Sequence, residues 1–282
     1  MKKIGFVDYY LSEWHANNYP AWINEICQEK GDSWQVAYAW AEENISPKDG
    51  VDTAAWCRQF GAVASDRLQE LCEKSDAIVI LAPSDPEKHL PYAETVLQYG
   101  KPTYIDKTFA PDLATAKRIM EIAEHYHTPV FSTSALRYAD EFSVCPACRQ
   151  VCTTGGGSDI GEYLIHQVEM VVRLLGVGAR KIWAEHVGDQ WMFRVFYNDD
   201  RCAVMTFGSG MPFTAYMNDG AGIRRWKQIS SNYFRALMAE ILAFFENGKL
   251  PFPAEETLEA MRIREGALRA AATPGTTITL SL

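Results

Sequence analysis

An acid and a lysine, Asp106 and Lys107, directly follow a short apolar segment, Thr103-Tyr104-Ile105, which has the composition of a buried strand. In a parallel α/β sheet, side chains that follow the carboxyl end of a strand lie at the edge where ligands bind. The carboxylate of Asp106 favours the charged form of Lys107, and a charged lysine can polarise a hydroxyl or carbonyl group. The pattern therefore indicates a catalytic Lys107, with a solvated surface lysine as the alternative.

A second strand end is expected at the same edge. The apolar run Ala77 to Leu81 is followed by Ala82 and Pro83, and residues 86–99 have helical spacing with His89 in the first turn. Because the carboxyl ends of parallel strands lie at one edge of a sheet, the two strand ends converge on one cleft.

A polar stripe occurs further along the chain. Glu162, His166, Glu169 and Arg173 recur at i, i+4, i+7 and i+11 on a helix whose other positions are apolar. A carboxylate on either side of His166 orients its ring and favours its protonated form, which suits a proton shuttle near neutral pH. The alternative is a solvated helix face.

Arg137 and Tyr138 follow the expected strand Val130 to Ser132, at another strand end of the same edge. An arginine there can fix a carboxylate or a sugar hydroxyl of a substrate. The alternative is an ion pair with Asp140 or Glu141.

The elements that position these residues change character along the chain. Apolar strands alternate with helical stretches as far as Thr133, which predicts a parallel sheet with right-handed crossovers. After Gly178, short alternating segments separated by turn residues predict an antiparallel meander. The expected strands are 4–7, 35–40, 77–81, 103–105, 130–132, 181–186, 191–197, 202–208, 212–217 and 277–280, and the longest helices are 112–125, 231–247 and 255–272. We therefore expect two domains, 1–133 and 134–282.

Composition excludes some classes of function. The chain has 282 residues, of which 48% are hydrophobic, enough for two cores. Its net charge is −9, and no basic cluster appears, which argues against a nucleic-acid partner. No targeting segment is visible, and no apolar run approaches the roughly 20 residues that span a bilayer, so we expect a cytoplasmic protein without a membrane partner.

Seven cysteines at scattered positions favour reduced thiols over a disulfide framework. Cys145, Cys148 and Cys152 lie at i, i+3 and i+7, which predicts one face of a helix that Pro146 helps to start. Three thiolates can hold zinc or an iron–sulfur cluster, but no fourth ligand lies nearby in sequence. We favour packing of these thiols in the core and predict no metal site.

Together, these segments resemble the Gfo/Idh/MocA family, the glucose-fructose oxidoreductase and inositol dehydrogenase group. In the first half of the chain, the resemblance rests on the strand ending at Pro83, on His89, on Gly100-Lys101-Pro102 and on Asp106-Lys107-Thr108. The family usually has Glu-Lys-Pro at the last of these positions. Further along, it rests on Arg137, the glycines 155–157, His166, and residues 248–251 and 255–257. It implies a Rossmann-type parallel sheet in the N-terminal domain and an α/β C-terminal domain with a mainly antiparallel sheet.

The resemblance also implies a function, NAD(P)-dependent oxidation or reduction of a sugar, cyclitol or related polyhydroxylated compound. In that reaction Lys107 polarises the reacting oxygen, His166 moves the proton and Glu162 orients His166. We expect a homo-oligomer through the C-terminal sheet. The implied cofactor-binding residues are Tyr10, Ser12, His15, Ala82, Pro83, His89 and Asp106, and the implied substrate-binding residues are Arg137, Tyr138 and Glu169.

The first turn departs from a dinucleotide-binding pattern. After the first strand a Gly-x-Gly-x-x-Gly motif is expected, whereas this chain reads Asp8-Tyr9-Tyr10-Leu11-Ser12-Glu13-Trp14-His15. One interpretation is a remodelled turn, with Ser12 as helix cap and phosphate donor and aromatic faces at Tyr10, Trp14 and His15. The other is a non-redox ligand-binding or regulatory member that has lost the cofactor. A third is a hydrolytic or lyase reaction that uses the nicotinamide transiently.

Overall fold

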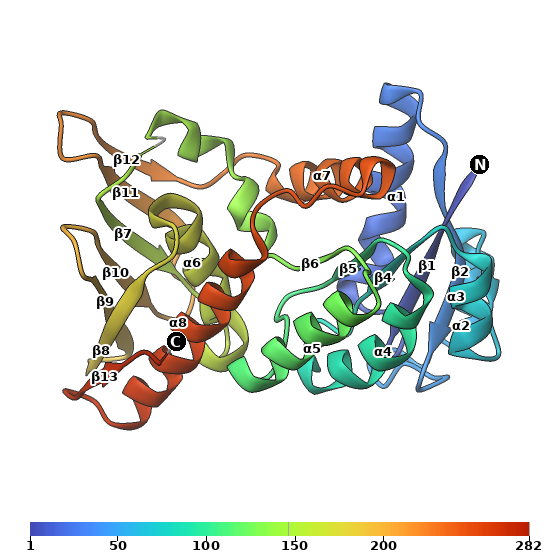
Figure 1. The fold of residues 1–282 in the computed structure, drawn as a ribbon, viewed down its shortest axis with the longest axis horizontal. Helices are drawn as coiled ribbons and strands as arrows, with labels where there is room; N and C mark the ends of the chain where they lie inside the picture. Colours follow the sequence, from blue (N-terminus) through green and yellow to red (C-terminus); the bar gives the residue numbers. More distant parts are fainter. Residues whose placement is uncertain (146, 282) are drawn as a thin grey trace. The chain divides into compact units, whose positions relative to one another are not determined.

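The computed structural model describes residues 1–145 and 147–281, which form two compact units (Figure 1). Unit 1 contains Met1–Ser132 and Leu237–Phe252, and unit 2 contains Thr133–Ala236 and Pro253–Leu282. The returning segment 237–252 differs from the expected division at residue 133. It joins unit 1 because its aromatic rings pack there. The distance between ring centroids is 4.9 Å for Phe244 and Phe131 and 5.6 Å for Phe245 and Trp34.

Unit 1 contains a parallel sheet with the strand order β3-β2-β1-β4-β5-β6. The strands are β1 Lys2–Asp8, β2 Trp34–Ala41, β3 Val63–Ala64, β4 Ala77–Ile80, β5 Thr103–Ile105 and β6 Val130–Phe131. The predicted parallel sheet is confirmed, and the short, exposed β3 is the strand of this sheet that the sequence pattern missed. Strands β2 and β3 lie on one side of β1, and β4, β5 and β6 lie on the other, so the direction in which strands are added reverses after β3. Sheets of this kind bind ligands at the carboxyl ends of the strands where this reversal occurs, here β1 and β4.

Helices link these strands. They are α1 Trp14–Lys30, α2 Thr53–Phe60, α3 Leu68–Lys74, α4 His89–Val96 and α5 Leu113–His125, with short 3-10 turns η1 Pro86–Lys88 and η2 Leu97–Tyr99. Of these, α1, α2 and α5 each have a side-chain N-cap. In α5 the Asp112 side chain accepts from the Thr115 amide, and the buried residues Ala116, Ile119, Ile122 and Ala123 follow the spacing of one helix face. The helix predicted at 112–125 is confirmed.

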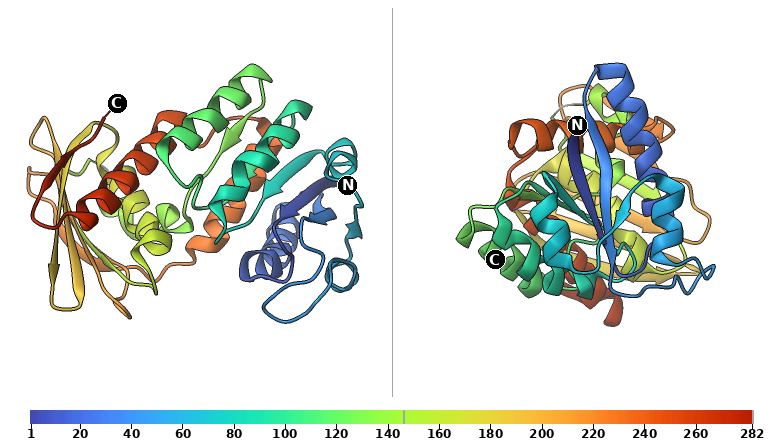
Figure 2. Two further views of the ribbon diagram at one scale, coloured as in Figure 1. Left: turned by 90° about the horizontal axis from the view of Figure 1, so that it is seen from below. Right: turned by 90° about the vertical axis from the view of Figure 1, so that its right-hand side faces the viewer.

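Unit 2 contains a mixed, mostly antiparallel sheet with the order β12-β11-β7-β10-β9-β8-β13, in which β7 and β10 are parallel. Its strands are β7 Gln150–Gly155, β8 Ala179–Val187, β9 Gln190–Tyr197, β10 Cys202–Phe207, β11 Thr214–Asn218, β12 Arg224–Gln228 and β13 Thr277–Thr279. Helices α6 Ile160–Leu175 and α8 Ala254–Ala272 pack on one face of this sheet (Figure 2, left). Helix α7, Tyr233–Asn247, begins in unit 2 and ends in unit 1.

The other face of this sheet carries a continuous row of side chains outside the core. Strand pairing places Trp226, Tyr216, Cys152, Val204, Arg194 and Trp183 in register across six strands. Each is exposed or half-buried, and the Trp226 side chain is 61% exposed. The row mixes apolar groups with one arginine.

The helix predicted through the cysteines of 145–152 is wrong. Residues Asp140–Val144 form the 3-10 turn η4, whereas Cys152 lies in β7. Cys145 and Cys148 are buried, but Cys152 is exposed because alternate residues of a strand face opposite sides of the sheet. The predicted helix start at Pro146 lies outside the described residues.

Among the described residues, no helix combines the length and the apolar character needed to cross a membrane.

Candidate active site

Lys107 lies at the carboxyl end of β5, as predicted, and it is 7% exposed. Its Nζ donates a 3.0 Å hydrogen bond to the carbonyl oxygen of Pro83, just after β4, and its backbone amide donates to Asp106 Oδ1 at 2.8 Å. The structure therefore brings the two predicted strand ends together through the lysine side chain. A buried ammonium group with one carbonyl partner keeps two further N–H donors.

Asp106 lies at the centre of a buried polar cluster rather than on an open surface. Its carboxylate accepts from Tyr104 Oη at 3.2 Å and forms an ion pair with the His15 ring, whose Nδ1 also lies 3.0 Å from Tyr19 Oη. Burial favours the protonated acid, but the charge and hydrogen bond of His15 outweigh it, so the pKa of Asp106 lies below its usual value. His15, predicted either as a stacking face or as a surface residue, is a buried ion-pair partner.

The cofactor-edge role predicted for His89 does not match its position. The imidazole is fully buried, with Nε2 at 2.6 Å from the Leu81 carbonyl oxygen and Nδ1 at 3.1 Å from that of Phe109. Burial lowers the pKa of His89. Because both ring nitrogens contact backbone oxygens of unit 1, the side chain ties the start of α4 to the core instead of facing a ligand.

The turn between β1 and α1 is capped by Glu13, so the prediction of Ser12 as helix cap is wrong. The role of Ser12 as phosphate donor stays a prediction. Ser12 has a φ of 64° and its Oγ donates to Asp49 Oδ2 at 2.7 Å. Glu13 instead accepts from the amides of His15 and Ala16.

Two further predicted residues lie against this turn. The Ala82 amide donates to Asp8 Oδ1 at 3.0 Å, which links the end of β4 to the end of β1. Tyr10 and Pro83 line a hollow of about 10 Å³, together with Asp8, Glu13, Lys48, Ser84 and Asp85. The predicted cofactor residues of this edge therefore pack mainly against the chain itself.

In unit 2, the His166 ring has a partner that the sequence did not predict. Ser134 Oγ lies 2.7 Å from His166 Nδ1, and it also accepts from the Leu136 amide as the cap of the 3-10 turn η3, Ala135–Tyr138. Glu162 lies in the first turn of α6, with its amide donating to Asp159 Oδ1. A serine before Ala135-Leu136-Arg137 is a recognisable cap, but nothing in the sequence places it beside a helix 32 residues away.

Arg137 and Glu169, both predicted to bind substrate, form an ion pair with each other. Arg137 Nη1 lies 3.3 Å from Glu169 Oε2, its Nη2 contacts Glu256, and Thr133 Oγ1 donates to Glu169 at 3.0 Å. Both ionic side chains are buried, and buried charges require such partners. The partners described for Arg137 are thus Glu169 and Glu256 rather than the alternatives Asp140 and Glu141. Substrate binding by Arg137 and Glu169 stays a prediction. Tyr138 is half-buried on η3, and its role in substrate binding stays a prediction.

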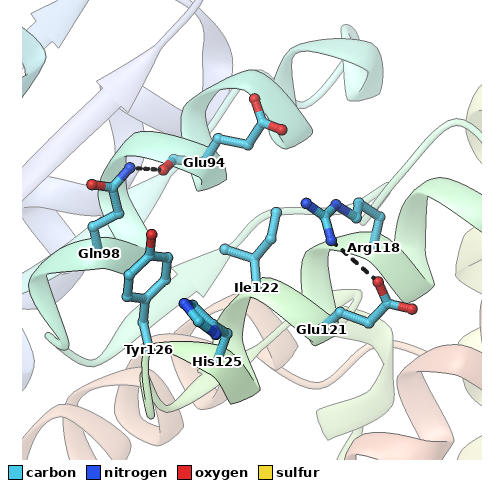
Figure 3. Close-up of a pocket in the computed structure, with 7 residues that line it drawn as sticks. All are labelled: Glu94, Gln98, Arg118, Glu121, Ile122, His125 and Tyr126. Carbon is cyan, nitrogen blue, oxygen red and sulfur yellow. Dashed lines mark hydrogen bonds and ion pairs between the residues drawn. The ribbon is translucent and has the colours of Figure 1, made fainter.

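A larger hollow lies elsewhere in unit 1, with a volume of about 650 Å³ (Figure 3). It is lined from α4, η2 and α5 by Glu94, Gln98, Arg118, Glu121, Ile122, His125 and Tyr126. Some of its polar groups bond within their own helices, as in the Arg118–Glu121 ion pair at 3.4 Å. Since none of the predicted site residues lines this hollow, it is not the site that the sequence indicates.

Residues 26–134 match the model of a family described as an oxidoreductase family with an NAD-binding Rossmann fold, GFO_IDH_MocA. This match confirms the resemblance to the Gfo/Idh/MocA family over residues 26–134. The matched range includes Asp106 and Lys107 but begins inside α1, so the turn that Glu13 caps lies outside it. A comparison of the sequence with curated proteins finds no match.

Solved structures share the fold over the full length of this chain. Scyllo-inositol dehydrogenase from Lactobacillus casei, with bound NAD(H) and scyllo-inositol, has a TM-score of 0.78 at 13% identity and covers 99% of each chain. GenD2 from gentamicin A biosynthesis, in complex with NAD, has a TM-score of 0.76 at 13% identity and covers 100% of this chain and 97% of its own. UDP-N-acetylglucosamine 3-dehydrogenase GnnA from Acidithiobacillus ferrooxidans has a TM-score of 0.75 at 13% identity and covers 96% and 97%.

The residues of the first turn do not fit the pyrophosphate of a dinucleotide. In a Rossmann fold this group binds the backbone amides at the N-terminus of the first helix. In this protein, the Glu13 carboxylate already accepts from two of those amides. The adjoining hollow of about 10 Å³ has room for about one water molecule.

Proposed function

We propose that this Gfo/Idh/MocA protein is an oxidoreductase that acts on a polyhydroxylated small molecule, such as a sugar or cyclitol. The family description supports the reaction class. The names of its structural neighbours, dehydrogenases of scyllo-inositol and of UDP-N-acetylglucosamine, support the class of substrate. The observation that carries the proposal is the buried Lys107 ammonium at the carboxyl end of β5.

Each proposed catalytic residue has a separate task. Lys107 donates a hydrogen bond to the reacting oxygen and stabilises negative charge that develops on it. His166 accepts or returns the hydroxyl proton, and its ring is held by Ser134. Glu162, one helical turn before His166, orients the ring, and Tyr138 contributes to substrate binding.

The proposed cofactor is NAD or NADP, as the family description and the NAD complexes of two neighbours suggest. No residue between β1 and α1 is assigned to its pyrophosphate, because Glu13 holds the amides of that turn. Asp106 and His15 are assigned to support of Lys107 rather than to cofactor contact, since they bond to each other.

The same capped turn favours a second candidate function. A family member whose pyrophosphate position is closed can bind a small molecule as a non-redox or regulatory protein, with Lys107 as a ligand-binding cation. In that case the ligand is bound but not oxidised.

One experiment separates the two candidates. The purified protein is incubated with a panel of polyols, sugars and nucleotide sugars plus NAD⁺ or NADP⁺, and the carbonyl product and reduced cofactor are quantified together. The oxidoreductase proposal expects equal amounts of both for at least one compound. Calorimetric binding of a panel compound without any carbonyl product would contradict it and support the non-redox candidate, and a converted product without net cofactor change would indicate a hydrolase or lyase.

A second copy of the chain is the proposed partner of the open sheet face in unit 2, which we define as the row from Trp226 to Trp183. Apolar side chains in register across a sheet gain free energy when a matching face covers them. We expect Trp226→Glu to lower the oligomeric state measured by light scattering. Val63→Glu, on the exposed edge strand β3, is the matched control and leaves it unchanged. An unchanged mass for Trp226→Glu would contradict this partner.

A further inference from the structure

The N-terminus of α1 is occupied by an anion that belongs to the chain. Glu13 is the N-cap residue, with extended backbone at φ −113° and ψ 173°, and its two carboxylate oxygens accept from the His15 amide at 2.8 Å and from the Ala16 amide. Its backbone carbonyl accepts the first helical bond from Asn17. A helix N-terminus carries about half a positive charge, so this carboxylate satisfies both the amides and the helix dipole.

The surroundings of this carboxylate are acidic and closed to solvent. Glu13 is 4% exposed and Asp8 is 1% exposed. Burial, and then the charge of Glu13, raise the pKa of Asp8 well above its usual value, and burial also raises the pKa of Glu13. Asp8 Oδ2 is buried and has no hydrogen-bond partner among the described residues. A dianionic pyrophosphate placed here meets these two buried acids, and Lys48 is the basic residue in the lining of the adjoining hollow.

The space beside the carboxylate is filled as well. Tyr10 is 9% exposed, and its ring lies 5.6 Å from the Lys48 ammonium. The hollow lined by Asp8, Glu13 and Pro83 has a volume of about 10 Å³, which suffices for about one water molecule but not for a phosphate group.

We infer that Glu13 is an internal substitute for the pyrophosphate, so that the chain itself closes the turn between β1 and α1 to dinucleotide phosphates. The helix keeps its anion-binding geometry, but the bound anion is covalently part of the protein. Removal of this one side chain therefore opens the turn to an external anion.

The test replaces Glu13 by serine. Serine keeps a capping oxygen for one amide and frees the other for phosphate, and it removes one of the two buried acids. Because a hydrogen bond to a charged group contributes about 1.5–3 kcal/mol, we expect the Kd for NADH, measured by fluorescence titration, to fall about tenfold or more. An unchanged or higher Kd in a folded Glu13→Ser protein overturns the inference.

Two variants serve as matched controls. Glu13→Asp keeps a capping carboxylate and is expected to keep the wild-type Kd. Glu25→Ser removes the same charge from an exposed position of the same helix and is also expected to have no effect. A tenfold gain in Glu25→Ser would show a general effect of net charge and overturn the inference.

A measurement on the wild-type protein removes any dependence on how the variants fold. The backbone ¹⁵N–¹H resonances of His15 and Ala16 are followed while NADH or inorganic pyrophosphate is added to millimolar concentration. They are expected to stay in place, because Glu13 holds both amides. Saturable shifts of these two resonances with inorganic pyrophosphate would overturn the inference.

The outcome is independent of the proposed function. Tighter NADH binding in Glu13→Ser without turnover of any polyol supports the inference and contradicts the oxidoreductase. Turnover by the wild type without a gain in Glu13→Ser supports the oxidoreductase and contradicts the inference.

Discussion

Replacement of Lys107 by alanine is expected to lower turnover of the polyol substrate by about 10²- to 10⁴-fold, the range typical of a positioned acid or base group. The ammonium lies at the carboxyl end of β5, is almost fully buried, and is oriented by the Pro83 carbonyl. A charge fixed in this way stabilises negative charge on a reacting oxygen without reorganisation at the moment of reaction. Steady-state kinetics of purified Lys107→Ala measure the effect.

The matched control is Lys117→Ala, an exposed lysine on α5 of the same unit. It is expected to keep wild-type turnover. A thermal melt of both variants shows whether loss of the bond to Pro83 perturbs the fold. Turnover of a folded Lys107→Ala protein within twofold of the wild type would remove Lys107 from the mechanism.

Replacement of Asp106 by alanine is expected to lower the free energy of unfolding of unit 1 by about 3–5 kcal/mol, the range found when one partner of a buried ion pair is removed. The carboxylate is 1% exposed and has bonds from Tyr104, from the Lys107 amide and from His15. Without it, the His15 ring and these donors lose their acceptor in the interior. Urea unfolding measures the difference.

The loss has a defined dependence on pH. The pKa of Asp106 is depressed in the folded state, so the acid contributes stability above its unfolded pKa of about 3.9, and that contribution disappears as the pH falls through the folded value. The gap between wild type and Asp106→Ala is therefore expected to be full near neutral pH and to close in acid. Glu121→Ala, from the exposed Arg118–Glu121 pair, should cost less than about 1 kcal/mol. A similarly small loss for Asp106→Ala would contradict the buried ion pair.

Most of the fold was predictable because its signals are local. Runs such as Ala77 to Ile80 and the periodic α5 carry their secondary structure in hydrophobic spacing, and the structure places them within a residue or two of the expected bounds. The errors occur where tertiary context decides. Cysteine spacing at 145–152 fits a helix, but from Gln150 onward the chain forms strand β7, because it pairs there with β10 and β11.

The site was predictable only in part, for a similar reason. The position of Lys107 follows from the strand before it, whereas the partners of the charged residues lie far away in sequence. Arg137 reaches Glu256, and His15 reaches Asp106. The choice between Ser12 and Glu13 as helix cap depends on the left-handed backbone of Ser12, which residue type alone does not specify.

The most direct measurement is a crystal structure of the wild-type protein grown with millimolar NADH. We expect the Glu13 carboxylate to accept from the His15 and Ala16 amides as it does without ligand, with no phosphate within hydrogen-bond distance of either amide. A pyrophosphate bound to those two amides, with the Glu13 side chain displaced, would contradict the closed first turn.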